Sequence, residues 1–514
     1  MIGQLSAFFY SDAYNYTIDL LFTKQSGQNA ENNVYLYIDF LPTQLQITMK
    51  KITLIFTIVC LLCCISCSQK GSSREDKEKQ EYAERVKKAF SKGWNAYTTY
   101  AYGMDAVNPI AKKGHNWYAE PLLMTPVDAY STMCLMGLDS IRQQAKDLIL
   151  NKLNFDKDMK VQQFEIAIRL VGGLISSYQL DGDKRFLDLA IDLGNRLLPI
   201  FDTPTGIPYR MVNLRTGEIS ENITNPCEVG SMLVEYGMLS KLTGNPIYYE
   251  KCKRGVQAVF DRRGKTGLVG SLINCDTGEW LDKRAHIRGG IDAFYEYLLK
   301  GYILFGDEDL KKMWDTSVTA IYTYLEDHTD HGMWMGEADM DTGERTATYF
   351  GALDCFWNGC LVLNGEIERA KKLQQSIFKL WTMQGIEPES IDYSTMQIRD
   401  AVYLIRPEAI EATYYIWKAT GDKKYYEMGK TMFESIEKYC QVDNGYTQLR
   451  DVRTKEKWDT LESFFFAETM KYCYLFFAPE EVFSFKDYVL NTEAHPMKNT
   501  WDEGWRGDYK MFLK

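Results

Sequence analysis

Histidine is scarce in this chain, and the few histidines lack a spacing that could hold a metal. The 514 residues include five histidines, and none of them forms an HExxH pair or a similar motif. A transition metal bound through histidines is therefore not expected. Basic residues are also outnumbered, with 59 Lys and Arg against 70 Asp and Glu, for a net charge of −11. Since no basic stripe is present, nucleic acid is not an expected partner.

Paired cysteines outside the N-terminal region are missing as well. Four of the twelve cysteines lie in one N-terminal apolar run, at Cys60, Cys63, Cys64 and Cys67. The other eight are scattered, mostly through apolar stretches, without a CxxC pair among them. They are expected to be buried thiols, although the sequence leaves open a disulfide that involves Cys227 or Cys275.

Apolar and aromatic residues are abundant. They make up 45% and 14% of the chain, which predicts a large core organised as one large domain or several smaller ones. Many Tyr and Trp residues beside an acidic net charge are compatible with a neutral polar ligand, such as a sugar that stacks on aromatic rings.

Residues 49–67 have the pattern of an export signal. A short basic start precedes an apolar core of about fourteen residues, which is too short for a comfortable membrane span. Ile65-Ser66-Cys67 resembles a bacterial lipobox, which predicts Cys67 as the lipid-bearing first residue of a protein anchored in the cell envelope, facing the periplasm or the outer-membrane surface. The polar residues 68–80 would form a tether. An ordinary signal peptide or an uncleaved anchor is the alternative, and residues 1–48 are predicted to be a spurious extension ahead of a true start at Met49.

From residue 81 the chain repeats one helical unit. A helix that is apolar nearly all round ends at a glycine, and an amphipathic helix follows. Residues 164–178 and 293–304 are examples of the first type, and residues 185–198 and 423–439 of the second. The turn glycines, each able to close a helix in the left-handed conformation, are Gly137, Gly182, Gly244, Gly306, Gly365 and Gly421. A seventh unit, residues 462–480, ends in Ala-Pro-Glu instead.

Longer loops join one unit to the next. The loops that begin at Gly206, Gly267 and Gly332 each contain a Thr-Gly-Glu turn, and a related loop begins at Gly445. Alternating residues around these turns predict β-hairpins.

Seven pairs of inner and outer helices describe a closed toroid, an (α/α)7 barrel that spans residues 81–497 and is followed by a tail at 498–514. An open solenoid would need polar caps at its ends. The first and last units, near Trp94 and Phe464, are as apolar as the middle, which favours closure.

Acidic residues recur near the starts of the predicted inner helices. They are Glu165, Glu228, Asp292, Asp354, Glu408, Glu411, Glu462 and Glu468. Their similar positions in a ring direct them toward one central cavity. Helix N-termini favour the ionised carboxylate, whereas burial and crowding favour the protonated form. Such a set can keep one acid protonated and another ionised, as glycoside cleavage requires.

Structural roles remain open for several of these acids. Glu165 could form a salt bridge with Arg169, Glu228 could pair with an arginine of the adjacent hairpin, and Asp354 could be a capping or loop acid. Glu408 and Glu411 could be a buried pair tied to Arg406. An oxygen-ligated cation such as calcium would suit this carboxylate-rich region.

Five motifs together resemble glycoside hydrolase family 47, the class I α-1,2-mannosidases. They begin at Phe164, Ile287, Arg406, Glu462 and Asn491, within a match that runs from about Lys87 to Pro496. The resemblance implies an (α/α)7 barrel and an inverting, Ca²⁺-dependent exo-α-1,2-mannosidase. Its substrate would be a mannose-containing glycan, either a high-mannose N-glycan or a mannooligosaccharide.

The resemblance also assigns roles to individual residues. Glu165 matches the general acid, Asp292 and Glu408 match the other catalytic carboxylates with Glu408 as base, and Glu389 matches a further active-site acid. Thr492 matches the calcium ligand, through its hydroxyl and its carbonyl, with water and sugar hydroxyls as the remaining ligands. The residues implied around the cation and the terminal sugar are Arg169, Arg406, Glu411, Phe464, Glu468 and Glu493.

Two positions depart from the processing mannosidases. Ala352 stands where those enzymes have a histidine, and Gly290 stands where they have an arginine. Both resemble the branch of ER degradation-enhancing mannosidase-like proteins, so the branch of the glycan that is trimmed stays open. A catalytically inactive glycan-binding surface lipoprotein, or another α/α-toroid enzyme such as a glucanase or an epimerase, is the alternative function. A monomer is expected, which meets the membrane only through its N-terminal lipid.

Overall fold

The structure is a computed structural model that describes residues 3–11, 14–22 and 74–499. Contacts divide the chain into two compact units, residues 1–75 and residues 76–514. In the first unit, β1 (Gly3–Ser11) pairs with β2 (Tyr14–Phe22) as an antiparallel hairpin. The predicted signal segment, the lipid site at Cys67 and most of the 498–514 tail lie outside the described residues.

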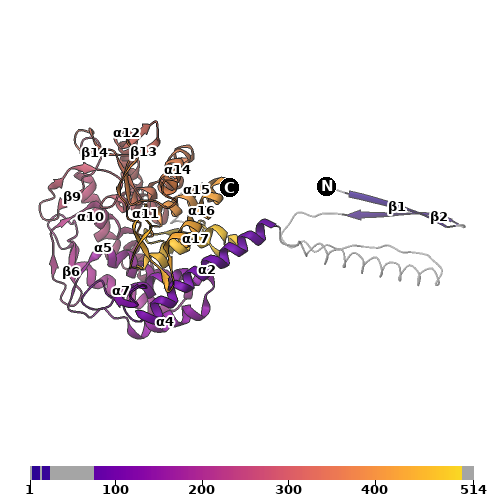
Figure 1. Cartoon of the computed structure of the whole chain (residues 1–514), viewed down its shortest axis with the longest axis horizontal. Helices are drawn as coiled ribbons and strands as arrows, with labels where there is room; N and C mark the ends of the chain where they lie inside the picture. The colour runs from indigo at the N-terminus through magenta and orange to yellow at the C-terminus, as the bar shows by residue number, and fades with distance from the viewer. Residues whose placement is uncertain (1–2, 12–13, 23–73, 500–514) are drawn as a thin grey trace. The chain divides into compact units, whose positions relative to one another are not determined.

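Residues 74–499 are mostly helical, and buried helices alternate with amphipathic ones (Figure 1). The buried segments are α3 (Met124–Met136), α5–η1–α6 (Gln163–Glu165, Ile166–Val171, Gly172–Asp181), α8–α9 (Pro226–Gly230, Leu233–Thr243), α11 (Asp292–Phe305), η3–α13 (Leu353–Phe356, Trp357–Leu363), α15 (Glu408–Thr420) and η4–α17 (Phe465–Thr469, Met470–Phe477). The amphipathic helices are α2 (Arg74–Tyr100), α4 (Asp139–Lys152), α7 (Lys184–Leu197), α10 (Ile247–Asp261), α12 (Glu308–Tyr324), α14 (Ile367–Thr382) and α16 (Lys423–Cys440). This alternation agrees with the seven units predicted from the sequence.

Each predicted turn glycine closes a buried helix. Gly137, Gly182, Gly244, Gly306, Gly365 and Gly421 have φ values between 65° and 84°. Most other residues are disfavoured in this left-handed region because their Cβ atoms clash with the backbone. The glycines therefore mark the boundary between buried and amphipathic helix, as predicted.

The longer loops form small sheets, including the predicted hairpins. These are β6–β7 (Met211–Asn213, Ile219–Ser220), β9–β10 (Leu272–Asn274, Trp280–Asp282), β14–β15 (Glu337–Asp339, Arg345–Ala347) and β21–β22 (Gln448–Asp451, Glu456–Trp458). Three of them gain a third strand: β5 (Lys160–Gln162) joins β6, β8 (Ile223–Thr224) joins β9, and β11 (Arg284–Ala285) joins β14. A further three-stranded sheet is β16–β17–β18 (Tyr349–Gly351, Ser390–Asp392, Gln397–Asp400).

Four two-stranded pairs complete the described strands of this unit. They are β3–β4 (Ala106–Asn108, Lys113–His115), β12–β13 (Glu326–Thr329, Gly332–Met335), β19–β20 (Gln441–Val442, Gly445–Tyr446) and β23–β24 (Tyr488–Leu490, Pro496–Lys498). Short 3₁₀ turns occur at η2 (Leu198–Phe201) and η5 (Glu480–Val482).

The first helices of the unit pack against the last ones. In Figure 1, α2 lies beside α17. The ring of Phe90 in α2 meets that of Phe466 edge-on, with centroids 5.2 Å apart, and Tyr82 lies 5.0 Å from Phe477. Thr132 of α3 donates a hydrogen bond to the carbonyl of Phe466. These contacts bury the apolar ends of the chain's helical run against each other.

The C-terminal hairpin inserts its loop among the buried helices. Asn491 Nδ2 donates to the carbonyl of Ile168 (3.1 Å) and to Glu235 Oε1 (2.7 Å). A Cβ at Gly172 would lie 2.7 Å from Asn491 Nδ2. Glycine at this position therefore lets the backbone of α6 approach the loop closely.

The predictions about the tether and about the cysteines can be compared directly with the described residues. Helix α2 begins at Arg74, so residues 74–80 of the predicted tether are helical. All eight cysteines of the described part, including Cys227 and Cys275, are free thiols. No helix among the described residues combines the length and the apolar character needed to cross a membrane.

Candidate active site

Arg169 collects three carboxylates from different parts of the chain, a group called here the Arg169 cluster. Its Nε donates to Glu165 Oε2 at 2.9 Å, one turn earlier. Its NH1 group bonds to Glu493 Oε1 and lies 3.7 Å from Asp128 Oδ2. Because the guanidinium is only 9% exposed, these acids are paired with an almost fully buried charge. The salt bridge of Glu165 with Arg169, which the sequence leaves open as a structural role, is present.

Aromatic rings cover the guanidinium of Arg169. The ring centroids of Trp117 and Phe464 lie 5.0 Å and 5.9 Å from its central carbon. Trp117 is in turn held by Glu462, whose Oε2 accepts from the indole nitrogen at 2.9 Å. The predicted site residues Glu165, Phe464 and Glu493 therefore meet around one arginine.

Glu165 lies at an irregular point of its helix. It ends the single turn α5 and is followed directly by the π-helical segment η1. The second π-helical segment among residues 74–499, η4, contains Glu468. Widened turns of this kind occur frequently at functional sites, and they change the direction in which a side chain projects.

Arg406 organises a second group, called here the Arg406 cluster. Its Nε and NH2 atoms donate to the two carboxylate oxygens of Glu389 at 3.2 and 2.8 Å. The alternative in which Arg406 holds Glu408 and Glu411 is replaced by this two-point pairing with Glu389. The preceding residue, Ile405, has φ 61°, a strained conformation for a β-branched residue.

Glu408, the first residue of α15, leaves one of its carboxylate oxygens without a partner. Its Oε2 atom is buried and has no hydrogen-bond partner in the structure. Burial raises the pKa of Glu408 to about 8, although Arg406 acts in the opposite direction. Glu411, one turn later, accepts a hydrogen bond from the hydroxyl of Tyr472 at 2.9 Å, and burial raises its pKa to about 7.

Asp292 is the first residue of α11, so it also lies at a helix N-terminus. Its Oδ1 accepts from the N–H of Ala293 at 2.9 Å. Burial raises its pKa, with Cys227, Ala293 and Arg406 acting in the opposite direction and Glu296 adding to the increase. The charge of Arg406 therefore acts on the pKa of both Asp292 and Glu408.

Glu468 and Glu493 connect the two clusters. Burial raises the pKa of Glu468 well above its usual range, and the charges of Glu493 and Glu408 add to that increase. The pKa of Glu493 is also raised by burial, against the effect of Arg169. Acids crowded in this way repel one another unless protons or a cation compensate their charge.

Thr492 lies in the inserted C-terminal loop, next to Glu493. Its backbone N–H donates to the hydroxyl of Tyr297 at 3.1 Å, and that hydroxyl donates to Glu235 Oε1 at 2.7 Å. The loop is closed by Asn491, whose Oδ1 accepts from the N–H groups of Glu493 and His495. The conformation of the predicted calcium ligand is therefore fixed by neighbours on both sides.

Several polar residues around these groups were missed by the sequence analysis. They are Asp128, Glu235, Glu296, Lys300, Glu387 and Lys471, all buried within apolar surroundings. Glu296 and Lys300 lie inside α11, beyond its first turn, and Glu387 lies in a loop, so none of these three has the helix N-terminal position of the predicted acids. Two weighed alternatives are observed: Arg210 pairs with Glu228 at 3.0 Å, and Asp354 accepts from the N–H of Gly351 at 2.7 Å.

The acids fit a cation that is bound mainly through water. Within residues 74–499, no three His, Cys, Asp or Glu side chains come together closely enough to ligate a metal directly. Buried carboxylate oxygens without a hydrogen-bond partner nevertheless occur on Asp128, Glu235 and Glu408. Carboxylate oxygens of this kind are the hydrogen-bond acceptors that the water shell of a divalent cation requires.

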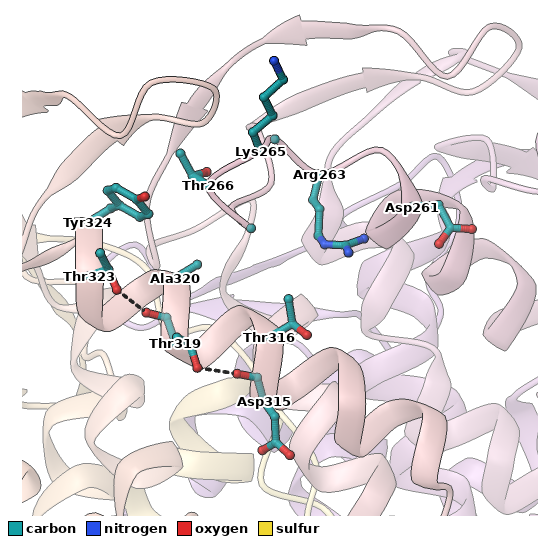
Figure 2. A pocket seen from close by; sticks show the side chains of 12 residues that line it. Asp261, Arg263, Lys265, Thr266, Asp315, Thr316, Thr319, Ala320, Thr323 and Tyr324 are labelled. Atoms are coloured by element: carbon teal, nitrogen blue, oxygen red, sulfur yellow. Dashed lines mark hydrogen bonds between the residues drawn. The ribbon is translucent and has the colours of Figure 1, made fainter.

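A groove with a volume of about 770 Å³ lies elsewhere on the molecule, between the loop after α10 and helix α12. Figure 2 shows Thr316, Thr319 and Thr323 along α12, facing the loop that carries Lys265. The predicted catalytic acids do not line it.

Comparisons with known proteins agree with this arrangement. The profile of Glycosyl hydrolase family 47 matches residues 89–499. Alpha-mannosidase I MNS5 of Arabidopsis thaliana is 34% identical over 466 residues, which cover 84% of this chain and 80% of the relative. ER degradation-enhancing alpha-mannosidase-like protein 2 of Mus musculus is 31% identical over 478 residues, 86% of this chain and 82% of that protein.

A solved structure gives the same result. An alpha-1,2-mannosidase from Trichoderma reesei matches with a TM-score of 0.76 and 27% identity, covering 82% of this chain and 99% of the other. The family predicted from the five motifs is confirmed: the chain belongs to Glycosyl hydrolase family 47.

Proposed function

We propose that this protein is an exo-α-1,2-mannosidase that removes terminal mannose from mannose-containing glycans. The observation that supports the proposal is the pair of arginine clusters: Arg169 is paired with Glu165, and the charge of Arg406 opposes the effect of burial on the pKa of both Asp292 and Glu408. The names of the relatives support the substrate class, because they include mannosyl-oligosaccharide 1,2-alpha-mannosidases as well as degradation-enhancing proteins.

The proposed reaction is hydrolysis with inversion. Glu408 removes a proton from the attacking water, and Glu165 supplies a proton to the glycosidic oxygen, directly or through water. Asp292 orients the nucleophile or the proton relay. Arg406 and Glu389 hold the region before α15, while Arg169, Phe464, Glu411, Glu468 and Glu493 surround the terminal sugar and the cation.

Calcium is the proposed cofactor, with Thr492 as its protein ligand. The crowded acids support this assignment, since a divalent cation would lower the pKa of Glu408 toward the range that a base needs at neutral pH. Chelation should abolish activity, and added Ca²⁺ should restore it. Full activity after exhaustive chelation would contradict the cofactor assignment.

The closed (α/α)7 barrel, the monomeric state and the lipid anchor are part of the same proposal. Contacts between α2 and the η4–α17 segment support closure. The pattern of residues 49–67 supports a lipid on Cys67 and a location in the cell envelope. Cys67→Ala should move the protein out of the membrane fraction, and peptides from residues 1–48 in the mature protein would contradict a start at Met49.

The test is hydrolysis of α-1,2-mannobiose by the full protein, with and without EDTA. We expect release of mannose, and NMR of the first product should show β-mannose from the α-linked substrate. α-Mannose as the first product would contradict inversion. Binding without turnover would instead favour a glycan-binding protein that lacks catalysis.

A further inference from the structure

The backbone just before Asp292 leaves space that no side chain fills. Gly290 has φ 96°, and a Cβ built on it would have no heavy atom within 4 Å. Gly289 is exposed, and its nearest neighbour at that position is the side chain of Leu353. An open corner therefore lies two residues from a proposed catalytic carboxylate.

Arg288 forms one wall of this corner. Its carbonyl accepts from the N–H groups of Ile291 and Asp292 at 3.1 and 3.2 Å, so it lies one hydrogen-bonded turn before Asp292. Its NH2 atom donates to Glu337 Oε2 at 2.6 Å, and its central carbon lies 5.8 Å from the ring centroid of Tyr349. The guanidinium is fixed, yet the side chain is 24% exposed.

The partners of Arg288 are themselves held in place. Glu337 lies on β14, is mostly buried, and accepts a second hydrogen bond from Thr346 at 3.0 Å. Tyr349 lies on β16, with Arg399 stacked 3.6 Å from its ring centroid. An arginine held in this way loses little conformational entropy when it binds a ligand.

The chemistry of the corner suits a sugar. The contact with Glu337 uses one nitrogen of a group that has five N–H donors. Leu353 adds a partly exposed apolar surface beside Gly289. Directed donors next to an apolar surface are the typical lining of a specific small-molecule site.

We propose that Arg288, with Tyr349 and Leu353, binds the part of the glycan beyond the sugar that is cleaved off, and so determines which oligomannose chains are accepted. This inference rests on the proposed function. In an exo-acting enzyme the terminal mannose occupies the innermost position among the acids. The remaining glycan must therefore extend away from the acids, and the corner adjoins them, because a Cβ built on Gly289 would lie 3.9 Å from Asp292 Oδ2.

The experiment compares two substrates, α-1,2-mannobiose and a branched high-mannose oligosaccharide. Arg288→Ala should reduce kcat/KM for the branched substrate about tenfold or more, the range for loss of a hydrogen bond to a charged group, and for mannobiose less than about threefold. Tyr349→Leu should act in the same direction. Arg284→Ala is the matched control, because Arg284 is an exposed arginine of the same segment that pairs with Asp282.

Arg288→Ala leaves the buried carboxylate of Glu337 without its arginine, which could prevent folding. If Arg288→Ala does not fold, two other variants replace it: Arg288→Gln, which keeps a donor for Glu337, and Tyr349→Leu, which leaves the ion pair intact. Each should lower kcat/KM more for the branched substrate than for mannobiose. Equal losses on both substrates, or no loss on either, would overturn the inference while leaving the proposed function in place. Failure of the unmodified protein to cleave either substrate would overturn the proposed function and this inference with it.

Discussion

The two arginines of the site use their charges differently. Arg169 is almost fully buried and meets Glu165, Glu493 and Asp128. The side chain of Arg406 is more exposed, at 21%, and pairs with Glu389 by donating to both carboxylate oxygens of that residue. Glu408, two residues later, keeps an oxygen without a partner. The structure therefore pairs Glu165 with a buried arginine and leaves one oxygen of Glu408 without a hydrogen-bond partner.

The largest effects should come from the acids themselves. Glu408→Gln and Glu165→Gln should each lower kcat by about 10²–10⁴, the usual range for a positioned proton-transfer group. Asp292→Asn should be comparably damaging. The measurement is turnover of α-1,2-mannobiose, with circular dichroism to confirm folding. A Glu408→Gln variant with near-normal kcat would move the base role to Asp292.

The sequence could predict the three catalytic candidates because the acids occur at repeated positions. Glu165, Asp292 and Glu408 lie at or near the first turn of buried helices, and the turn glycines set the phase of each unit. The partners could not be predicted in the same way. Proximity in sequence leaves open a pairing of Arg406 with Glu408 and Glu411, but Arg406 binds Glu389 from a preceding loop.

Other features depended on contacts that no local pattern encodes. Asp128 reaches Arg169 from another buried helix, and Tyr297 meets Thr492 only because the C-terminal loop inserts among the helices. The π-helical segments at Glu165 and Glu468 also have no signal in a search for a period of 3.6 residues.

Substituting each arginine tests whether the more buried one contributes more to stability. Arg169→Met leaves the buried acids Glu493 and Asp128 without their counter-charge, and we expect the free energy of unfolding to fall by about 3–5 kcal/mol. Arg406→Met exposes Glu389 to more solvent and should cost less, about 1.5–3 kcal/mol. Urea denaturation of both variants provides the measurement. An equal loss of unfolding free energy in the two variants would show that the different burial of Arg169 and Arg406 does not change their contributions to stability.

Stability should also depend on pH through the acids of α15. The pKa values of Glu408 and Glu411, about 8 and about 7, are raised above the value of about 4.5 for an unfolded chain. The folded state therefore binds more protons between these values. The stabilisation is complete below about pH 4.5 and is lost as the pH rises through 7 to 8.

In EDTA the Tm should therefore be lower at pH 8 than at pH 5. Added Ca²⁺ should reduce this difference, because a cation replaces the protons that the acids otherwise need. Glu411→Gln should weaken the pH dependence, whereas Glu368→Gln, at an exposed position on α14, should leave it unchanged. A Tm that rises from pH 5 to pH 8 without calcium would contradict this prediction.

The smallest expected effect concerns the hydroxyl that connects Thr492 to the buried helices. Tyr297→Phe removes the acceptor for the N–H of Thr492 and a donor to Glu235, and should lower the free energy of unfolding by about 0.5–1.5 kcal/mol. Tyr236→Phe is the matched control, since its hydroxyl bonds to the carbonyl of Gly194, which lies on the amphipathic helix α7. Both variants should lose similar stability, but only Tyr297→Phe should raise the Ca²⁺ concentration needed for half-maximal activity, because only Tyr297 contacts the proposed ligand. Equal calcium midpoints for the two variants would mean that Tyr297 stabilises the fold without orienting Thr492.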